Sequence, residues 1–328
     1  MSRTMEPTHI LEMLSTNREF LRRRSDTALS NLSMLHSSLD EVADEGVIIS
    51  LALNDAIASM VFSADYAGAI RISQAVIDRF RNTKYVNLIA SHEMLIGRCY
   101  TFTLDFDRAW EHLHMAEAIA FDALEIGDAT RTLRADILHE VGMTTMQSGR
   151  DKDEAIRCFE KALRILGHEG HNRRRAVCIM AIGNVRYAES RFGDAQNYYM
   201  RAEALLEETD DYYNLSAALC NLGVCHMCLG AYGIAEAYLT RSLEIRKRSG
   251  TYGDIAGSYY NLAALYEHRG ELERAYKTML ISRDYAQLSQ VRILQIKIVK
   301  ELEMMSLSLG DISAAEDHRS HLQEMERA

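Results

Sequence analysis

Apolar residues recur three and four positions apart along most of the chain, which is the spacing of one face of an amphipathic helix. Two such series follow each other closely, first Leu219, Leu222, Val224 and Cys225, and then Ala235, Tyr238, Leu239, Leu243 and Ile245. The 328 residues include one proline, a residue that is common in loops and strand edges and disfavoured inside helices. The pattern therefore predicts long helices joined by short turns.

The same pattern repeats with a period of 40 residues, marked by alanines. These alanines are Ala69, Ala109, Ala155, Ala195, Ala235, Ala275 and Ala315, and one step, from 109 to 155, is longer than the others. A second small residue precedes the alanine by about twelve positions in five units, at Gly97, Gly142, Gly183, Gly223 and Ala263. Because small residues let two antiparallel helices approach closely, each unit is predicted to be a helix hairpin that crosses at these positions.

A third landmark lies in the turn between the two helices of each unit. Glycine occupies it at Gly149, Gly230, Gly270 and Gly310, other small residues occupy it at Ala64 and Ser190, and Leu104 is the exception. Glycine adopts left-handed backbone conformations without steric cost. We therefore expect this position to end the first helix of each pair.

Each unit also carries a fixed order of side-chain types: large, small, aromatic, glycine, alanine, bulky, small. Two units show it most fully, at Leu222, Gly223, His226, Gly230, Ala235, Leu239 and Ser242, and at Leu262, Ala263, Tyr266, Gly270, Ala275, Met279 and Ser282. The units resemble tetratricopeptide repeats, in a 40-residue variant similar to those of kinesin light chain, spindle-orientation adaptors and bacterial sensor regions. The resemblance implies an all-α fold, a right-handed superhelical solenoid of antiparallel helix pairs.

We expect the chain to consist of two parts. Residues 1–49 lie outside the repeat register and are interpreted as an N-terminal helical cap, because a terminal repeat otherwise exposes its packing face. Residues 50–328 are interpreted as about seven helix pairs, with units starting near 50, 90, 135, 176, 216, 256 and 296.

The net charge and the cysteines indicate which classes of binding partner and which cellular compartment to expect. The formal net charge of -10 argues against a nucleic-acid partner, which requires a basic face. The six cysteines show no paired spacing, which favours a reducing cytoplasm. No stretch approaches the roughly 18 to 20 apolar residues of a membrane span, so no membrane partner is expected.

The sequence offers little that indicates catalysis. It contains no phosphate-binding glycine loop, nucleotide fingerprint or nucleophile elbow, so we expect neither an enzyme nor a cofactor. Four possible soft-metal ligands occur within nine residues, at Cys220, Cys225, His226 and Cys228. They spread around a helix axis, so we interpret them as small packing residues and expect no metal site.

By the resemblance, a partner segment would lie along a concave groove formed by the first helices of the pairs. The groove positions correspond to Arg98, His139, Asn184, Tyr187, Asn221, Asn261, Glu267, His268 and Lys297. Related repeats use asparagines at the places of Asn221 and Asn261 to hold a peptide backbone. The alternative is that both amides bond to a neighbouring repeat, since an amide donates and accepts at once. A clamp for a terminal carboxylate would also use Lys297, but Glu301 stands where a cation is expected.

These observations favour a cytoplasmic module that binds a protein or peptide. The input part of a bacterial signalling system is one form of that hypothesis. Two alternatives stay open: a regulator that senses a ligand or peptide and changes its superhelical shape, and a self-assembling scaffold, with a homodimer as one case.

Overall fold

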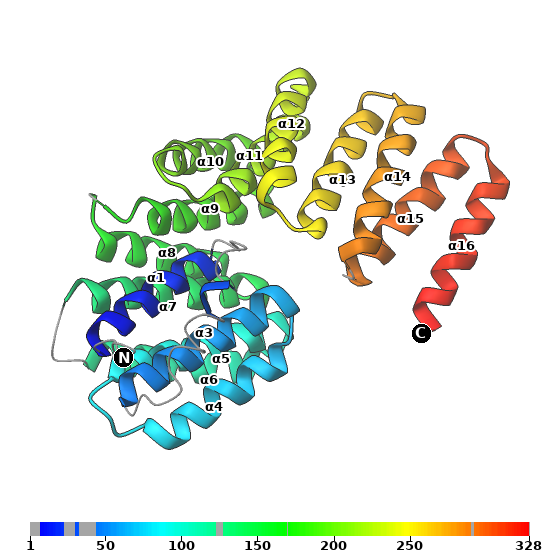
Figure 1. Ribbon diagram of the computed structural model, residues 1–328. Coiled ribbons are helices and arrows are strands. Elements are labelled where there is room, and N and C mark those ends of the chain that lie inside the picture. Colours follow the sequence, from blue (N-terminus) through cyan, green and yellow to red (C-terminus); the bar gives the residue numbers. More distant parts are fainter. Residues whose placement is uncertain are drawn as a thin grey trace. The chain divides into compact units, whose positions relative to one another are not determined.

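The computed structural model describes residues 7–22, 30–32, 44–122, 127–168, 170–289 and 292–327, and nearly all of these residues are helical (Figure 1). The helices are α1 (Pro7–Arg22), α3 (Glu45–Ser63), α4 (Tyr66–Phe80), α5 (Val86–Phe102), α6 (Phe106–Asp122), α7 (Asp128–Gln147), α8 (Lys152–Leu166), α9 (Asn172–Ala188), α10 (Phe192–Glu207), α11 (Tyr212–Cys228), α12 (Tyr232–Ser249), α13 (Tyr252–His268), α14 (Leu272–Ser289), α15 (Arg292–Ser308) and α16 (Ile312–Arg327). These ranges contain no strand. The predicted all-α fold is confirmed.

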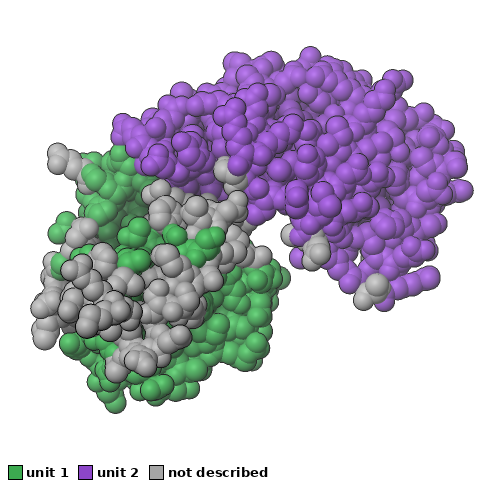
Figure 2. Space-filling view, viewed as in Figure 1, with its two compact units in different colours: residues 1–185 green, residues 186–328 purple. Residues whose placement is uncertain are grey.

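The chain forms two compact units, residues 1–185 and residues 186–328, with the boundary inside α9 (Figure 2). In unit 1, α3 packs with α4, α5 with α6, and α7 with α8. In unit 2, α11 packs with α12, α13 with α14, and α15 with α16. We call the odd-numbered members of these pairs, together with α9, first helices, and their even-numbered successors second helices. The pair that we expected to start near residue 50 begins at Glu45.

The two helices of a pair cross too closely for larger side chains. All seven marked alanines are buried, with exposed fractions of at most 1%. A Cβ atom on Gly223 would lie 2.6 Å from Cγ of Leu239 and 3.2 Å from the carbonyl oxygen of Ala235. In another pair, a Cβ atom on Gly97 would lie 2.7 Å from Cγ of Leu113. The predicted crossings are thus confirmed, and their small residues are required by contact.

Every turn landmark adopts the left-handed backbone conformation. The φ angles are 51° at Ala64, 63° at Leu104, 71° at Gly149, 58° at Ser190, 76° at Gly230, 76° at Gly270 and 78° at Gly310. The conformation is therefore required by the turn, including at Leu104, where the sequence departs from the pattern. There the side chain is 68% exposed and does not pack in compensation.

Helix α1 covers α3 in unit 1. Ile10 and Leu14 are buried against Val47. The amide of Asn17 donates to Oδ1 of Asn54 at 3.2 Å, and Nδ2 of Asn54 donates to the carbonyl oxygen of Leu14 at 3.3 Å. Of the expected N-terminal cap, residues 1–49, the structure describes 7–22, 30–32 and 44–49.

A buried histidine joins three helices of unit 1. His92 on α5 has Nδ1 3.0 Å from Oγ of Ser73 on α4 and Nε2 3.1 Å from the carbonyl oxygen of Ile49 on α3. Because a carbonyl oxygen only accepts, Nε2 donates to Ile49 and Ser73 donates to Nδ1 in the neutral ring. Burial lowers the pKa of His92 to about 4, so the ring stays uncharged near neutral pH.

The low pKa of His92 predicts a loss of stability in mild acid. Between its ordinary pKa of 6.5 and about 4, the unfolded chain takes up a proton that the folded ring does not bind. The free energy of unfolding should therefore fall across this range by up to about 3 kcal/mol from this residue. Urea unfolding at stepped pH measures it. The His92→Gln variant should show a smaller slope, and equal slopes in the two proteins would contradict the prediction.

The strained turn of α5 predicts a stabilising substitution. Leu104→Gly relieves a left-handed conformation that costs about 1 to 2 kcal/mol for an L-residue, and about half of this gain is offset by the greater freedom of glycine in the unfolded chain. We expect the free energy of unfolding to rise by about 0.5 to 1 kcal/mol. Leu104→Ala keeps the strain and serves as the matched control. If both variants change stability alike in urea unfolding, the turn is not strained.

Candidate functional site

The first helices of unit 2 contact one another through polar side chains one repeat apart. On α13, Nδ2 of Asn261 donates to Sγ of Cys220 on α11 at 3.0 Å. The hydroxyl of Tyr260 donates to Oε1 of Glu301 on α15 at 3.0 Å. Nζ of Lys297, also on α15, lies 4.2 Å from the centre of the Tyr260 ring, in cation–π contact. The three helices therefore align in a common register.

Helical spacing extends these contacts into a continuous surface, which we call the first-helix face. Its members share one side of each helix and are Ala217, Cys220, Val224, Met227 and Cys228 on α11, Gly257, Tyr260, Ala264, Glu267 and His268 on α13, and Lys297, Lys300, Met304, Leu307 and Ser308 on α15. The α15 part is the most open, with Met304 62% exposed. The face combines a floor of small and apolar residues with charged and polar edges.

Gly257 lies in the N-terminal half of α13 and has no packing contact that requires a glycine. A Cβ atom there would meet no side chain and no neighbouring helix within 4 Å, in contrast to Gly223. Glycine inside a helix is destabilising by about 0.5 to 1 kcal/mol relative to alanine. On the middle helix of the first-helix face, the helix backbone thus carries no side chain at Gly257, at one end of the face, and another chain could approach it closely there.

Five predicted groove residues lie on or beside this face. Asn261 bonds to the neighbouring repeat through Cys220, as the alternative interpretation holds. Glu267 and His268 are exposed at the end of α13, and Lys297 lies against Tyr260. Asn221 is partly buried on α11.

Two further groove residues meet around one carboxylate in unit 1. Nη1 of Arg98 on α5 lies 3.7 Å from Oε1 of Glu140 on α7, and Nδ1 of His139 lies 3.6 Å from the same oxygen. Asn184 on α9 is partly buried. Of these predicted residues, Arg98 thus contributes to a contact between two repeats, and His139 contacts a carboxylate on its own helix.

Cysteines of α11 also meet a predicted groove residue. The hydroxyl of Tyr187 lies 3.7 Å from Sγ of Cys228, which is exposed. Cys225 is buried, and burial raises the pKa of its thiol to about 12, so the sulfur is protonated. In the ranges that the structure describes, no group of three or more histidine, cysteine or acidic side chains is arranged to hold a metal ion.

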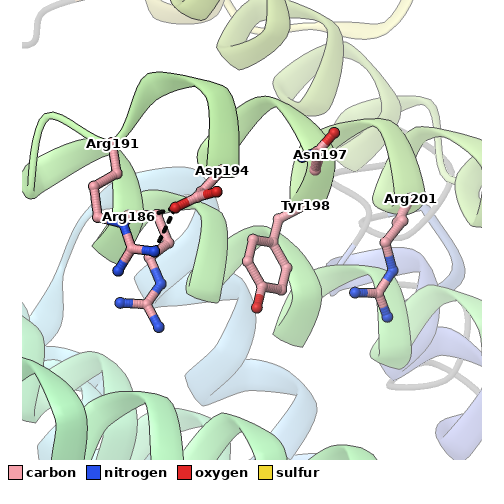
Figure 3. Close-up of a pocket in the computed structure, with 6 residues that line it drawn as sticks. All are labelled: Arg186, Arg191, Asp194, Asn197, Tyr198 and Arg201. Atoms are coloured by element: carbon pink, nitrogen blue, oxygen red, sulfur yellow. Dashed lines mark hydrogen bonds and ion pairs between the residues drawn. The ribbon is translucent and has the colours of Figure 1, made fainter.

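Sequence reasoning missed a pocket of about 310 Å³ on α9 and α10 in unit 2 (Figure 3). It is lined by Arg186, Arg191, Asp194, Asn197, Tyr198 and Arg201. Nε of Arg191 donates to Oδ2 of Asp194 at 2.7 Å, and Nη1 of Arg186 donates to Oε2 of Glu189 at 2.9 Å. The sequence pattern that could have indicated the pocket is the recurrence of polar residues three and four positions apart, at 194, 197, 198 and 201. This spacing places four polar side chains on one side of α10.

Comparison with known proteins identifies the repeats. The tetratricopeptide repeat family model matches residues 214–279, which begin within α11 and end within α14. Among curated proteins, none matches the chain. The matched family is one of interaction repeats rather than of catalytic domains. None of the helices described here is long and apolar enough to cross a bilayer.

Solved structures share the fold at low sequence identity. A signal-transduction ATPase with a tetratricopeptide repeat sensor from Pyrococcus horikoshii aligns with a TM-score of 0.66 and 12% identity over 99% of this chain and 50% of that one. A Rap protein complexed with Competence and Sporulation Factor aligns at 0.60 and 14% over 98% of both chains. The Rap conjugation gene regulator of plasmid pLS20, in complex with the Phr* peptide, aligns at 0.59 and 16% over 96% of this chain and 84% of that one.

Residues 214–279 thus carry tetratricopeptide repeats, and the fold of the chain is that of a helical solenoid of this type. The resemblance stated from the sequence is confirmed.

The contact between α13 and α15 predicts a measurable contribution to stability. Tyr260→Phe removes the donor to Glu301 and should lower the free energy of unfolding by about 1 kcal/mol. Tyr252→Phe is the matched control, because Tyr252 lies on the same helix with 52% of its surface exposed. Urea unfolding of both variants checks this. A loss of the same size in Tyr252→Phe would show that the hydroxyl bond to Glu301 contributes nothing specific.

Proposed function

We propose that the chain binds an extended peptide, free or as a segment of a partner protein, along the first-helix face of unit 2. Gly257 is the observation that carries this proposal. Alanine and most larger residues would strengthen α13, and a Cβ atom at this position would meet no neighbour, yet the residue is glycine. Helix backbone that carries no side chain on a surface suits close approach by another main chain.

The side chains around Gly257 supply what an extended peptide requires. Such a peptide brings unpaired N–H and C=O groups, and the exposed side chains of Glu267 and His268 offer an acceptor and a donor. Lys297 and Lys300 place positive charge on α15. We expect an acidic side chain or the terminal carboxylate of the peptide to lie toward these lysines.

The structural neighbours support the same class of ligand. Two of the Rap structures are complexes, one with Competence and Sporulation Factor and one with the Phr* peptide, and a third neighbour carries a tetratricopeptide repeat sensor. By this likeness of fold, we propose the input part of a bacterial signalling system as the setting. Its place would be the cytoplasm, where the free cysteines remain reduced.

The test uses peptides selected from a random display library on the full chain. Gly257→Leu should raise the free energy of unfolding by about 0.5 to 1 kcal/mol, because leucine is the better helix former. The same variant should weaken peptide binding at least tenfold, as measured by fluorescence anisotropy, because its side chain covers the bare backbone.

Gly233→Leu on α12 is the matched control. Gly233 is exposed and also has no neighbour within 4 Å, but it lies on a second helix. This variant should leave the affinity unchanged. Enrichment of no peptide, or an unchanged affinity in Gly257→Leu, would contradict the proposal.

A further inference from the structure

The second helices of unit 2 show how one arginine holds two carboxylates across a repeat boundary. Nη1 of Arg241 on α12 donates to Oε1 of Glu203 at 3.0 Å, and its Nη2 donates to Oε1 of Glu207 at 2.7 Å. The two glutamates are one turn apart on α10. A guanidinium at this repeat position therefore has the reach and the geometry to bind carboxylates.

Arg201 occupies the same repeat position 40 residues earlier, without such partners. Glu203 and Glu207 precede Arg241 by 38 and 34 residues, and the corresponding positions before Arg201 are Leu163 and Gly167. Neither of these residues carries a carboxylate. In the part of the chain that the structure describes, Arg201 makes no ion pair; its guanidinium lies 5.6 Å from the centre of the Tyr198 ring and is exposed.

Arg201 also forms one side of the pocket on α9 and α10. In Figure 3 the ring of Tyr198 lies between Arg201 and the pair formed by Arg191 and Asp194. Since Arg186 and Arg191 are each paired with a carboxylate, Arg201 gives the pocket a net positive charge. The paired arginines still contribute N–H groups, because a guanidinium has five.

We propose that this pocket binds a carboxylate group of an acidic ligand, with Arg201 as the principal contact. The amide of Asn197 and the hydroxyl of Tyr198 add neutral donors to the lining. The carboxylate comes either from an acidic side chain of a partner polypeptide or from a small carboxylic acid, and the chemistry of recognition is the same. The pocket shares no residue with the first-helix face, so this site is independent of the proposed peptide-binding function.

Isothermal titration of the full chain with three probes tests the proposal. The probes are citrate, an alanine-based helical peptide with glutamates four residues apart, and the same peptide with glutamines. We expect citrate or the glutamate peptide to bind at low ionic strength, with affinity that falls as salt is added. Binding of the glutamate peptide alone assigns a polypeptide source, and binding of citrate alone assigns a small acid. Failure of both, or equal binding of the glutamine peptide, overturns the proposal.

Variants locate the site. Arg201→Gln should weaken binding of the carboxylate probe at least tenfold, because it removes the charge-assisted hydrogen bonds between the guanidinium and the carboxylate. Arg241→Gln is the matched control, since its guanidinium already holds two glutamates; it should lower stability and leave binding intact. An equal loss of binding in both variants would overturn the proposal by showing attraction to net charge alone. Gly257→Leu should bind the carboxylate probe like the unmodified chain, which keeps this result separate from a failure of the first-helix face.

Discussion

A close crossing of two helices, repeated through both units, is the constraint on which the rest of the structure depends. At Gly223 the second helix lies so near that a single added carbon would overlap Leu239, and the marked alanines are buried for the same reason. Once the crossings fix the distance between paired helices, each helix has one side committed to packing. Its other positions are free to differ between repeats, and these carry the first-helix face and the arginine pocket.

Much of this fold could be predicted because the crossings impose a period that survives in the sequence. Only small residues fit at them, so Ala69 through Ala315 could be read without an alignment of relatives. The turn was less visible. Leucine at position 104 does not indicate a left-handed conformation, yet Leu104 adopts one, because the length of the connection requires this backbone conformation with or without glycine.

The candidate site was only partly predictable from the sequence. Its contacts join different helices, and the 40-residue period does not determine how far one helix is displaced along another. The bond from Asn261 to Cys220 depends on how far α13 is displaced along α11. Arg201 becomes distinctive only when Arg241 is seen to hold two glutamates. Gly257 could have been found, since it is not one of the small positions marked at the helix crossings, whereas Gly223 is. A Cβ atom would overlap a neighbour at Gly223 and would meet none at Gly257.

The polar contacts between first helices also differ from one interface to the next. The α11–α13 interface joins an amide to a sulfur, whereas the α13–α15 interface joins a phenol to a carboxylate. If α15 packed directly against α11, with the hairpin between them left out, the Glu301 carboxylate would face the thiol of Cys220. The Tyr260 hydroxyl would then have lost its acceptor. Such mismatched polar contacts disfavour the stacking of these similar hairpins in the wrong order.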